Sequence, residues 1–110
     1  MSDCLFCKIV EGSVPSRKVF EDDSTFAFED IAPRAPTHVL IVPKSHVDTI
    51  AAASDEALVG RVLLTAARIA RERGLDSYRL VVNNGEGAGQ TVFHLHVHLL
   101  GGRPMSWPPG

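Results

Sequence analysis

The sequence has little of several features that define large classes of proteins. Its 110 residues include no apolar run near the roughly 20 residues that a membrane-spanning helix requires. The formal net charge of −2 argues against a nucleic-acid-binding protein, which usually carries a basic surface. Residues 1–4 lack the basic stretch and apolar core of a secretory signal. These absences predict a cytoplasmic protein that binds neither membrane nor nucleic acid.

Cysteine is also scarce, since the only two are Cys4 and Cys7. A reducing compartment makes a structural disulfide unexpected. A redox dithiol usually belongs to a thioredoxin-like βαβ arrangement, and this chain has none. Inert thiols and metal ligands remain. A structural zinc site of the two-cysteine, two-histidine type would need two further ligands from elsewhere in the chain.

Length and composition predict one domain spanning residues 1–110, with 45% hydrophobic and 22% charged residues. Strands are expected at residues 17–21, 25–29, 37–42, 78–83 and 92–100, and a short helical turn at 46–53. Helical spacing of apolar residues predicts a long helix over 57–73, capped by Ser54 and ended by Gly74. Strands on both sides of one long helix, without βαβ alternation, favour an α+β fold with a mostly antiparallel five-stranded sheet.

The chain places three of its five histidines, His94, His96 and His98, at alternate positions. In a strand these rings share one face, while Phe93, Leu95, Val97 and Leu99 form an apolar row on the other. Imidazole accepts protons, attacks electrophiles and binds metals at neutral pH. This segment is therefore the first place to look for function.

Three interpretations of the histidine row differ in the chemistry that they imply. Half-buried structural histidines would leave ring nitrogens unpaired at a cost in free energy. One metal held by all three would have to bridge about 13 Å of extended strand. A nucleophilic histidine beside a substrate-binding one is the third interpretation. The glycine-containing loop at 85–91 could offer backbone amides to an anion, which favours phosphate chemistry.

The run from His94 to Leu100 resembles the signature of the histidine-triad (HIT) nucleotide-binding proteins. The resemblance extends over residues 26–33 and 35–44. Residues 81–85, 89–92, 101–103 and 107–110 resemble the Hint branch of that family. The resemblance implies a HIT-like fold with one long and one short helix, and a homodimer that binds purine nucleotides such as AMP or GMP.

The same resemblance implies a hydrolase of nucleoside phosphoramidates, without an organic cofactor. His96 would attack the α-phosphorus and form a nucleotidyl-histidine intermediate, assisted by His38 and His98. Asp30 and Ile31 match positions that hold the ribose and base. The phosphate-facing positions, besides His96 itself, are Asn83, Gly89, Gln90, Thr91 and His98. A dinucleoside polyphosphate hydrolase and a nucleotide-binding regulatory or scaffold protein are the alternatives.

Two positions depart from the pattern. Thr91 stands where Hint proteins often have serine, but it keeps a hydroxyl that can bond a phosphate oxygen. Ser106 stands where some relatives have histidine, so no substrate preference is inferred from the tail. Bacterial relatives also pair such cysteines with two histidines, which implies a closed structural zinc site of Cys4, Cys7, His46 and His94.

Overall fold

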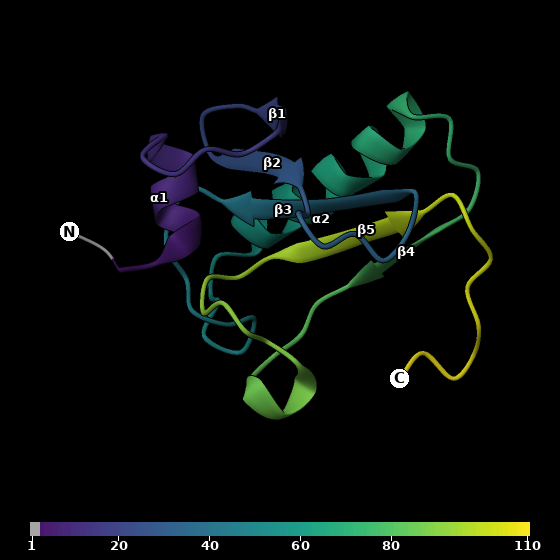
Figure 1. Cartoon of the computed structure of the whole chain (residues 1–110). Coiled ribbons are helices and arrows are strands. Elements are labelled where there is room, and N and C mark those ends of the chain that lie inside the picture. The colour runs from purple at the N-terminus through teal and green to yellow at the C-terminus, as the bar shows by residue number, and fades with distance from the viewer. Residues whose placement is uncertain (1–2) are drawn as a thin grey trace.

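The computed structural model describes residues 3–110, and its core is an antiparallel sheet with strand order β1-β2-β3-β5-β4 (Figure 1). The strands are β1 (Lys18–Glu21), β2 (Thr25–Glu29), β3 (Thr37–Pro43), β4 (Tyr78–Val81) and β5 (Val97–Gly101). The helices are α1 (Leu5–Glu11), α2 (Glu56–Glu72) and the short 3₁₀ helix η1 (Glu86–Ala88). The predicted α+β fold with a five-stranded sheet and one long helix is confirmed.

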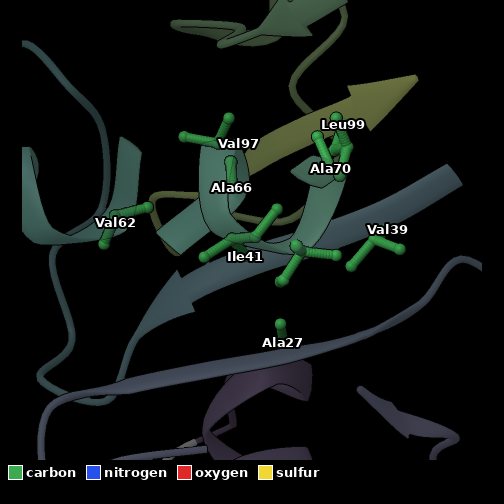
Figure 2. Packing of buried hydrophobic residues seen from close by; sticks show 9 residues of the cluster. Ala27, Val39, Ile41, Val62, Ala66, Ala70, Val97 and Leu99 are labelled. Atoms are coloured by element: carbon green, nitrogen blue, oxygen red, sulfur yellow. The ribbon is translucent and has the colours of Figure 1, made fainter. Parts of the chain in front are cut away.

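The long helix α2 covers one face of the sheet and crosses behind it in Figure 1. Its first turn is capped by the side chain of Asp55, which accepts a hydrogen bond from the Leu58 amide, so the predicted cap at Ser54 was one residue early. Because side chains alternate along a strand, one set of strand residues meets this helix. Figure 2 shows that contact, formed by Ala27, Val39, Ile41, Val62, Ala66, Ile69, Ala70, Val97 and Leu99.

The short helix α1 packs on the opposite face of the sheet. Its Phe6 and Ile9 are buried against Phe26, Phe28, Leu40 and Val42, the strand residues that alternate with the α2-facing set. The helix ends at Gly12, whose φ of +87° favours glycine. The sequence placed its short helical turn at 46–53 instead, where the chain makes only a turn at 50–52. Helix α1 was missed because seven residues give a weak periodic signal.

The histidine segment is only partly a strand. Strand β5 begins at Val97, so His98 lies within the sheet while His94 and His96 precede it. Strand β5 begins there because Val97 is the first residue of the segment that pairs with β3, opposite Ile41. The next residue, His98, pairs with Val81, the last residue of β4. The prediction of one continuous strand over 92–100 was therefore wrong.

The predicted apolar row of this segment was partly right. Leu95, Val97 and Leu99 are buried as expected, but Phe93 is exposed. Among residues 3–110, no helix has the length and hydropathy that crossing a bilayer requires.

Candidate functional site

Four predicted metal ligands meet beside the sheet. One ligand atom from each of Cys4, Cys7, His46 and His94 lies within 4.8 Å of all the others. The His94 Nδ1 atom is 3.3 Å from Cys4 Sγ and 3.5 Å from Cys7 Sγ, and His46 Nδ1 is 3.4 Å from Cys7 Sγ. A tetrahedral zinc ion would hold sulfur and nitrogen ligands about 3.6 Å apart. The cluster therefore fits zinc in both donor type and spacing.

Hydrogen bonds on the far side of both imidazoles orient them for this task. The Nε2 atom of His94 lies 2.7 Å from the Pro43 carbonyl, which can only accept, so Nε2 carries the hydrogen. The Nε2 atom of His46 lies 2.5 Å from a carboxylate oxygen of Asp48 and likewise donates. Both Nδ1 lone pairs are thus left facing the cysteines, as in metal-binding histidines generally. Sequence reasoning missed Asp48, whose only signal was its place two residues after His46.

Three separate parts of the chain supply the cluster. Cys4 caps α1 and accepts a hydrogen bond from the Cys7 amide at 3.4 Å. His46 follows β3, and His94 is fully buried in the segment before β5. The Leu95 amide donates to the Val47 carbonyl, which joins the two histidine-bearing segments directly. The cluster therefore ties the N-terminal helix to the triad.

A second cluster lies at the other end of the triad, around His38 and His98. The Nε2 atom of His38 is 3.0 Å from His98 Nδ1 and 3.3 Å from a carboxylate oxygen of Asp30. The other ring nitrogen, His38 Nδ1, accepts a hydrogen bond from the Arg34 amide at 3.0 Å. His38 Nε2 must then carry the hydrogen, which it donates to His98 Nδ1. Neutral His98 in turn carries its own hydrogen on Nε2.

The middle histidine, His96, is oriented by the backbone of His94. Its Nδ1 atom lies 2.7 Å from the His94 carbonyl and donates to it, which leaves the lone pair on Nε2. Its ring is 7% exposed, with the Phe6 ring edge-on at 5.0 Å and the His98 ring also at 5.0 Å. Sequence reasoning also missed Phe6, which lies between the two cysteines.

Burial keeps the site histidines neutral. It lowers the pKa of His96 and of His38, with the Asp30 carboxylate acting in the opposite direction on both. Burial, followed by the proximity of His96 and His38, lowers the pKa of His98 to about 4. At neutral pH all three rings are therefore uncharged, and of the three only His96 has a lone pair, on Nε2, that no hydrogen bond within the site occupies.

Comparison with known proteins agrees with this arrangement. The sequence model of the family described as "HIT domain" matches residues 11–105. The chain belongs to the HIT domain family. An uncharacterized HIT-like protein of Synechocystis sp. is 51% identical over 98% of this chain and 97% of its own length. Among solved structures, a HIT family hydrolase from Legionella pneumophila is 51% identical and has a TM-score of 0.96, covering 98% of this chain and 100% of its own.

A more distant relative is described as a nucleotide-binding protein. The histidine triad nucleotide-binding protein from Candida albicans is 33% identical with a TM-score of 0.85, over 96% of this chain and 83% of its own. These three relatives cover 96–98% of this chain, whereas the family match begins at residue 11, after Cys4 and Cys7.

Several positions expected to contact a nucleotide are open in this HIT domain. Ile31, next to Asp30, is 97% exposed, which is unusual for a large apolar side chain. Gly89 lies beside Asn83, since a Cβ at Gly89 would be 3.9 Å from the Asn83 amide nitrogen. Thr91 is exposed as well. An exposed apolar side chain thus lies next to Asp30, and Gly89 and Thr91 are exposed in the glycine-containing loop.

Gln90 differs from the other predicted nucleotide contacts because it is buried and fully bonded. Its side-chain oxygen accepts from the Gly85 amide at 2.8 Å. Its side-chain nitrogen donates to the carbonyls of Asp48 at 2.8 Å and Val92 at 3.1 Å. In this conformation Gln90 holds the glycine-containing loop in place and ties it to the residue that orients His46.

Proposed function

We propose that this HIT domain protein is a purine nucleoside phosphoramidate hydrolase of the Hint branch that works through His96. The observation that carries the proposal is the His96 ring, which is neutral and has its Nδ1 hydrogen bonded to a backbone carbonyl. Its Nε2 lone pair is therefore free to attack an electrophile. The descriptions of relatives as a hydrolase and as a nucleotide-binding protein support the same assignment.

The proposed reaction has two displacements at phosphorus. In the first, His96 Nε2 forms a bond to the α-phosphorus, the bond from phosphorus to the amine breaks, and the amine leaves with a proton supplied by solvent water. In the second, water attacks the same phosphorus and gives a proton back to solvent, the bond to His96 breaks, and the nucleoside monophosphate is released. Two easier steps thereby replace one difficult displacement.

Neighbouring residues have matching roles in this proposal. His98 carries a hydrogen on Nε2 and donates a hydrogen bond from it to the phosphoryl group or to the leaving amine. His38 holds His98 in that tautomer. Asp30 and the exposed Ile31 hold the ribose and the base, while Asn83, Gly89 and Thr91 contact phosphate. Gln90 contributes by fixing the loop that carries Gly89.

The test is to measure turnover of AMP joined to a primary amine by wild-type protein and by His96→Ala. We expect loss of at least about four orders of magnitude, as for removal of a nucleophile, with AMP binding largely retained. Acid-quenched wild-type protein should carry one nucleotidyl group on His96 by peptide mass spectrometry. Normal turnover by His96→Ala would refute the mechanism. Faster turnover of diadenosine polyphosphates would favour the alternative hydrolase, and binding without turnover a regulatory protein.

We also propose that Cys4, Cys7, His46 and His94 hold one structural zinc ion. Four protein ligands close the coordination sphere, so the ion would stabilise the fold rather than activate water. Elemental analysis of protein purified without a metal-binding tag should find about one zinc per chain. Absence of stoichiometric zinc would overturn the assignment.

The last part of the proposal is that the protein is a cytoplasmic homodimer. Strand β4 ends the sheet and leaves one edge without a neighbouring strand, and Tyr78 on it is partly exposed. On α2, Leu64 is 72% exposed, and Trp107 in the tail is 80% exposed. Burying these apolar side chains against a second copy of the chain would stabilise a dimer. Sedimentation equilibrium should give twice the mass of one chain.

A further inference from the structure

The segment after β5 contacts the loop that carries the predicted nucleotide residues. At Gly102 the backbone has a φ of +91°, and a Cβ would lie only 2.9 Å from Pro36 Cβ. The next residue, Arg103, donates from Nε to the Arg34 carbonyl at 2.9 Å. Two consecutive residues thus hold the loop at 30–36 from outside. Neither the sheet nor the proposed reaction accounts for these contacts.

Arg34 is held at both of its backbone groups. Its carbonyl accepts from Arg103, and its amide donates to His38 Nδ1 at 3.0 Å. The side chains of residues 31–34 are exposed, so little packing fixes this part of the loop. Pro33 and Pro36 have no amide hydrogen that could replace the Arg34 donor. Besides the Ala32 amide, which donates to Asp30 Oδ1 at 2.8 Å, the contacts made by Gly102 and Arg103 therefore hold this amide in position.

The Arg34 amide, facing Nδ1, and the Asp30 carboxylate, facing Nε2, together keep the His38 hydrogen on Nε2. With a donor facing Nδ1, the hydrogen is confined to Nε2, where it bonds His98 Nδ1. If the amide moved away, Nδ1 would lose its donor and become able to carry the hydrogen, and only the acceptors near Nε2, Asp30 and His98, would still favour Nε2. In the Nδ1-protonated form, His38 Nε2 and His98 Nδ1 could both present lone pairs 3.0 Å apart. His98 would then change its own tautomer to restore a hydrogen bond.

We propose that Arg103 is a positioning residue that sets the tautomers of His38 and His98 through the backbone of Arg34. It touches neither ring, and its effect passes through two hydrogen bonds of a single residue. The effect of this residue on turnover rests on the proposed function, since it assumes that His98 donates from Nε2. The effect on the tautomers does not.

The chain supplies a matched control in Arg79. This arginine also donates to a tail carbonyl, that of Ser106 at 2.9 Å, and its guanidinium lies over the Trp107 ring at 5.7 Å. Replacing either arginine by alanine removes a charge and a hydrogen bond to or from the tail. Of the two, Arg103 is the one that bonds Arg34.

The experiment is ¹⁵N NMR of the histidine rings in full-length wild type, Arg103→Ala, Arg103→Lys and Arg79→Ala at neutral pH. Wild type and Arg79→Ala should show His38 and His98 protonated on Nε2. Arg103→Ala should give mixed tautomers for both, and Arg103→Lys should restore the wild-type pattern in part because lysine can still donate. Unchanged tautomers in a folded Arg103→Ala protein would overturn the proposal, as would an equal change in Arg79→Ala.

Turnover of an AMP phosphoramidate supplies the second measurement. We expect Arg103→Ala to lower kcat by up to about a hundredfold, the size of effect that small misplacement of a reacting group produces. Should wild type fail to turn the substrate over, the proposed function fails while the tautomer measurement still decides the role of Arg103. If Arg103→Ala does not fold, Gly102→Ala is the second variant, since its Cβ would displace Pro36 and the same loop.

Discussion

The two histidine clusters at the ends of the triad have similar spacing but opposite hydrogen-bond patterns. Cys4, Cys7, His46 and His94 form one group with ligand atoms within 4.8 Å of each other, and Asp30, His38 and His98 form another. In the first cluster, the Asp48 carboxylate and the Pro43 carbonyl accept the Nε2 hydrogens of His46 and His94. The Nδ1 lone pairs of both rings therefore face the cysteines. In the second, the Arg34 amide on the outside sends the His38 hydrogen inward.

This difference assigns the clusters to different chemistry. A metal ion needs converging lone pairs, which the cysteine-containing cluster supplies. In the other cluster a hydrogen on His38 Nε2 already lies between His38 and His98. Moving that hydrogen to His38 Nδ1 would place it against the hydrogen of the Arg34 amide. Proximity of ligating side chains is therefore insufficient to identify a metal site. What decides is the partner of the ring nitrogen that faces away from the cluster. An acceptor there leaves a lone pair facing the cluster for a metal, and a donor there places a hydrogen facing the cluster.

The largest effect should come from Cys7→Ser compared with Asp30→Asn. Losing the Cys7 thiolate should reduce the zinc content from about one ion per chain to nearly none. The free energy of unfolding should fall by much of the roughly 10 kcal/mol that a structural zinc contributes. Asp30→Asn should keep its zinc. Elemental analysis and thermal unfolding measure both. Stoichiometric zinc in folded Cys7→Ser, or its loss in Asp30→Asn, would contradict the comparison.

Next in size is the effect of His38→Phe on turnover. The apolar ring cannot donate to His98 Nδ1, so we expect kcat for an AMP phosphoramidate to fall by at least about a hundredfold while zinc content stays unchanged. His38→Gln is the matched variant, because its amide nitrogen can donate in place of Nε2. Equal activity of the phenylalanine and glutamine variants would show that the hydrogen bond has no catalytic role.

A smaller effect is expected for Asp48→Asn. The amide can no longer serve as a charged acceptor for His46 Nε2, so zinc affinity should fall by about 10- to 100-fold. Competition with a chromogenic chelator measures the affinity. Asp22→Asn changes a carboxylate that bonds only nearby backbone amides, Ser24 and Thr25, and should leave the affinity unchanged. An unaltered affinity in Asp48→Asn would remove this aspartate from the account of the site.

The last effect is in the pH dependence of stability. The pKa of His98 is about 4 in the folded protein against an ordinary value of 6.5, so the unfolded chain binds more protons between these values. The free energy of unfolding contributed by neutral His98 is complete above pH 6.5 and is lost as the pH falls toward 4. Denaturant unfolding across this range measures it, and His98→Asn should reduce the slope. Titration of His98 near 6.5 by NMR would exclude this contribution.

Much of the fold followed from local patterns. Strand β2 was predicted at its observed bounds, and α2 within a residue at each end, because alternation and helical spacing extend over enough residues to give clear signals. The four metal ligands followed from the family resemblance, and the structure brings them together. The start of β5 at Val97 and the helix at Leu5–Glu11 did not follow, because both depend on which segments pack beside them.

The sequence by itself determined the residue types, the apolar faces and membership of a family of similar chains. Only the tertiary structure decided which nitrogen of each histidine carries a hydrogen. The groups that fix those hydrogens belong to Pro43, His94, Asp48, Arg34 and, for His98, His38, and three of the five are backbone groups. Every residue other than proline has the same backbone groups, so a sequence pattern carries no mark of which carbonyl or amide will meet a ring.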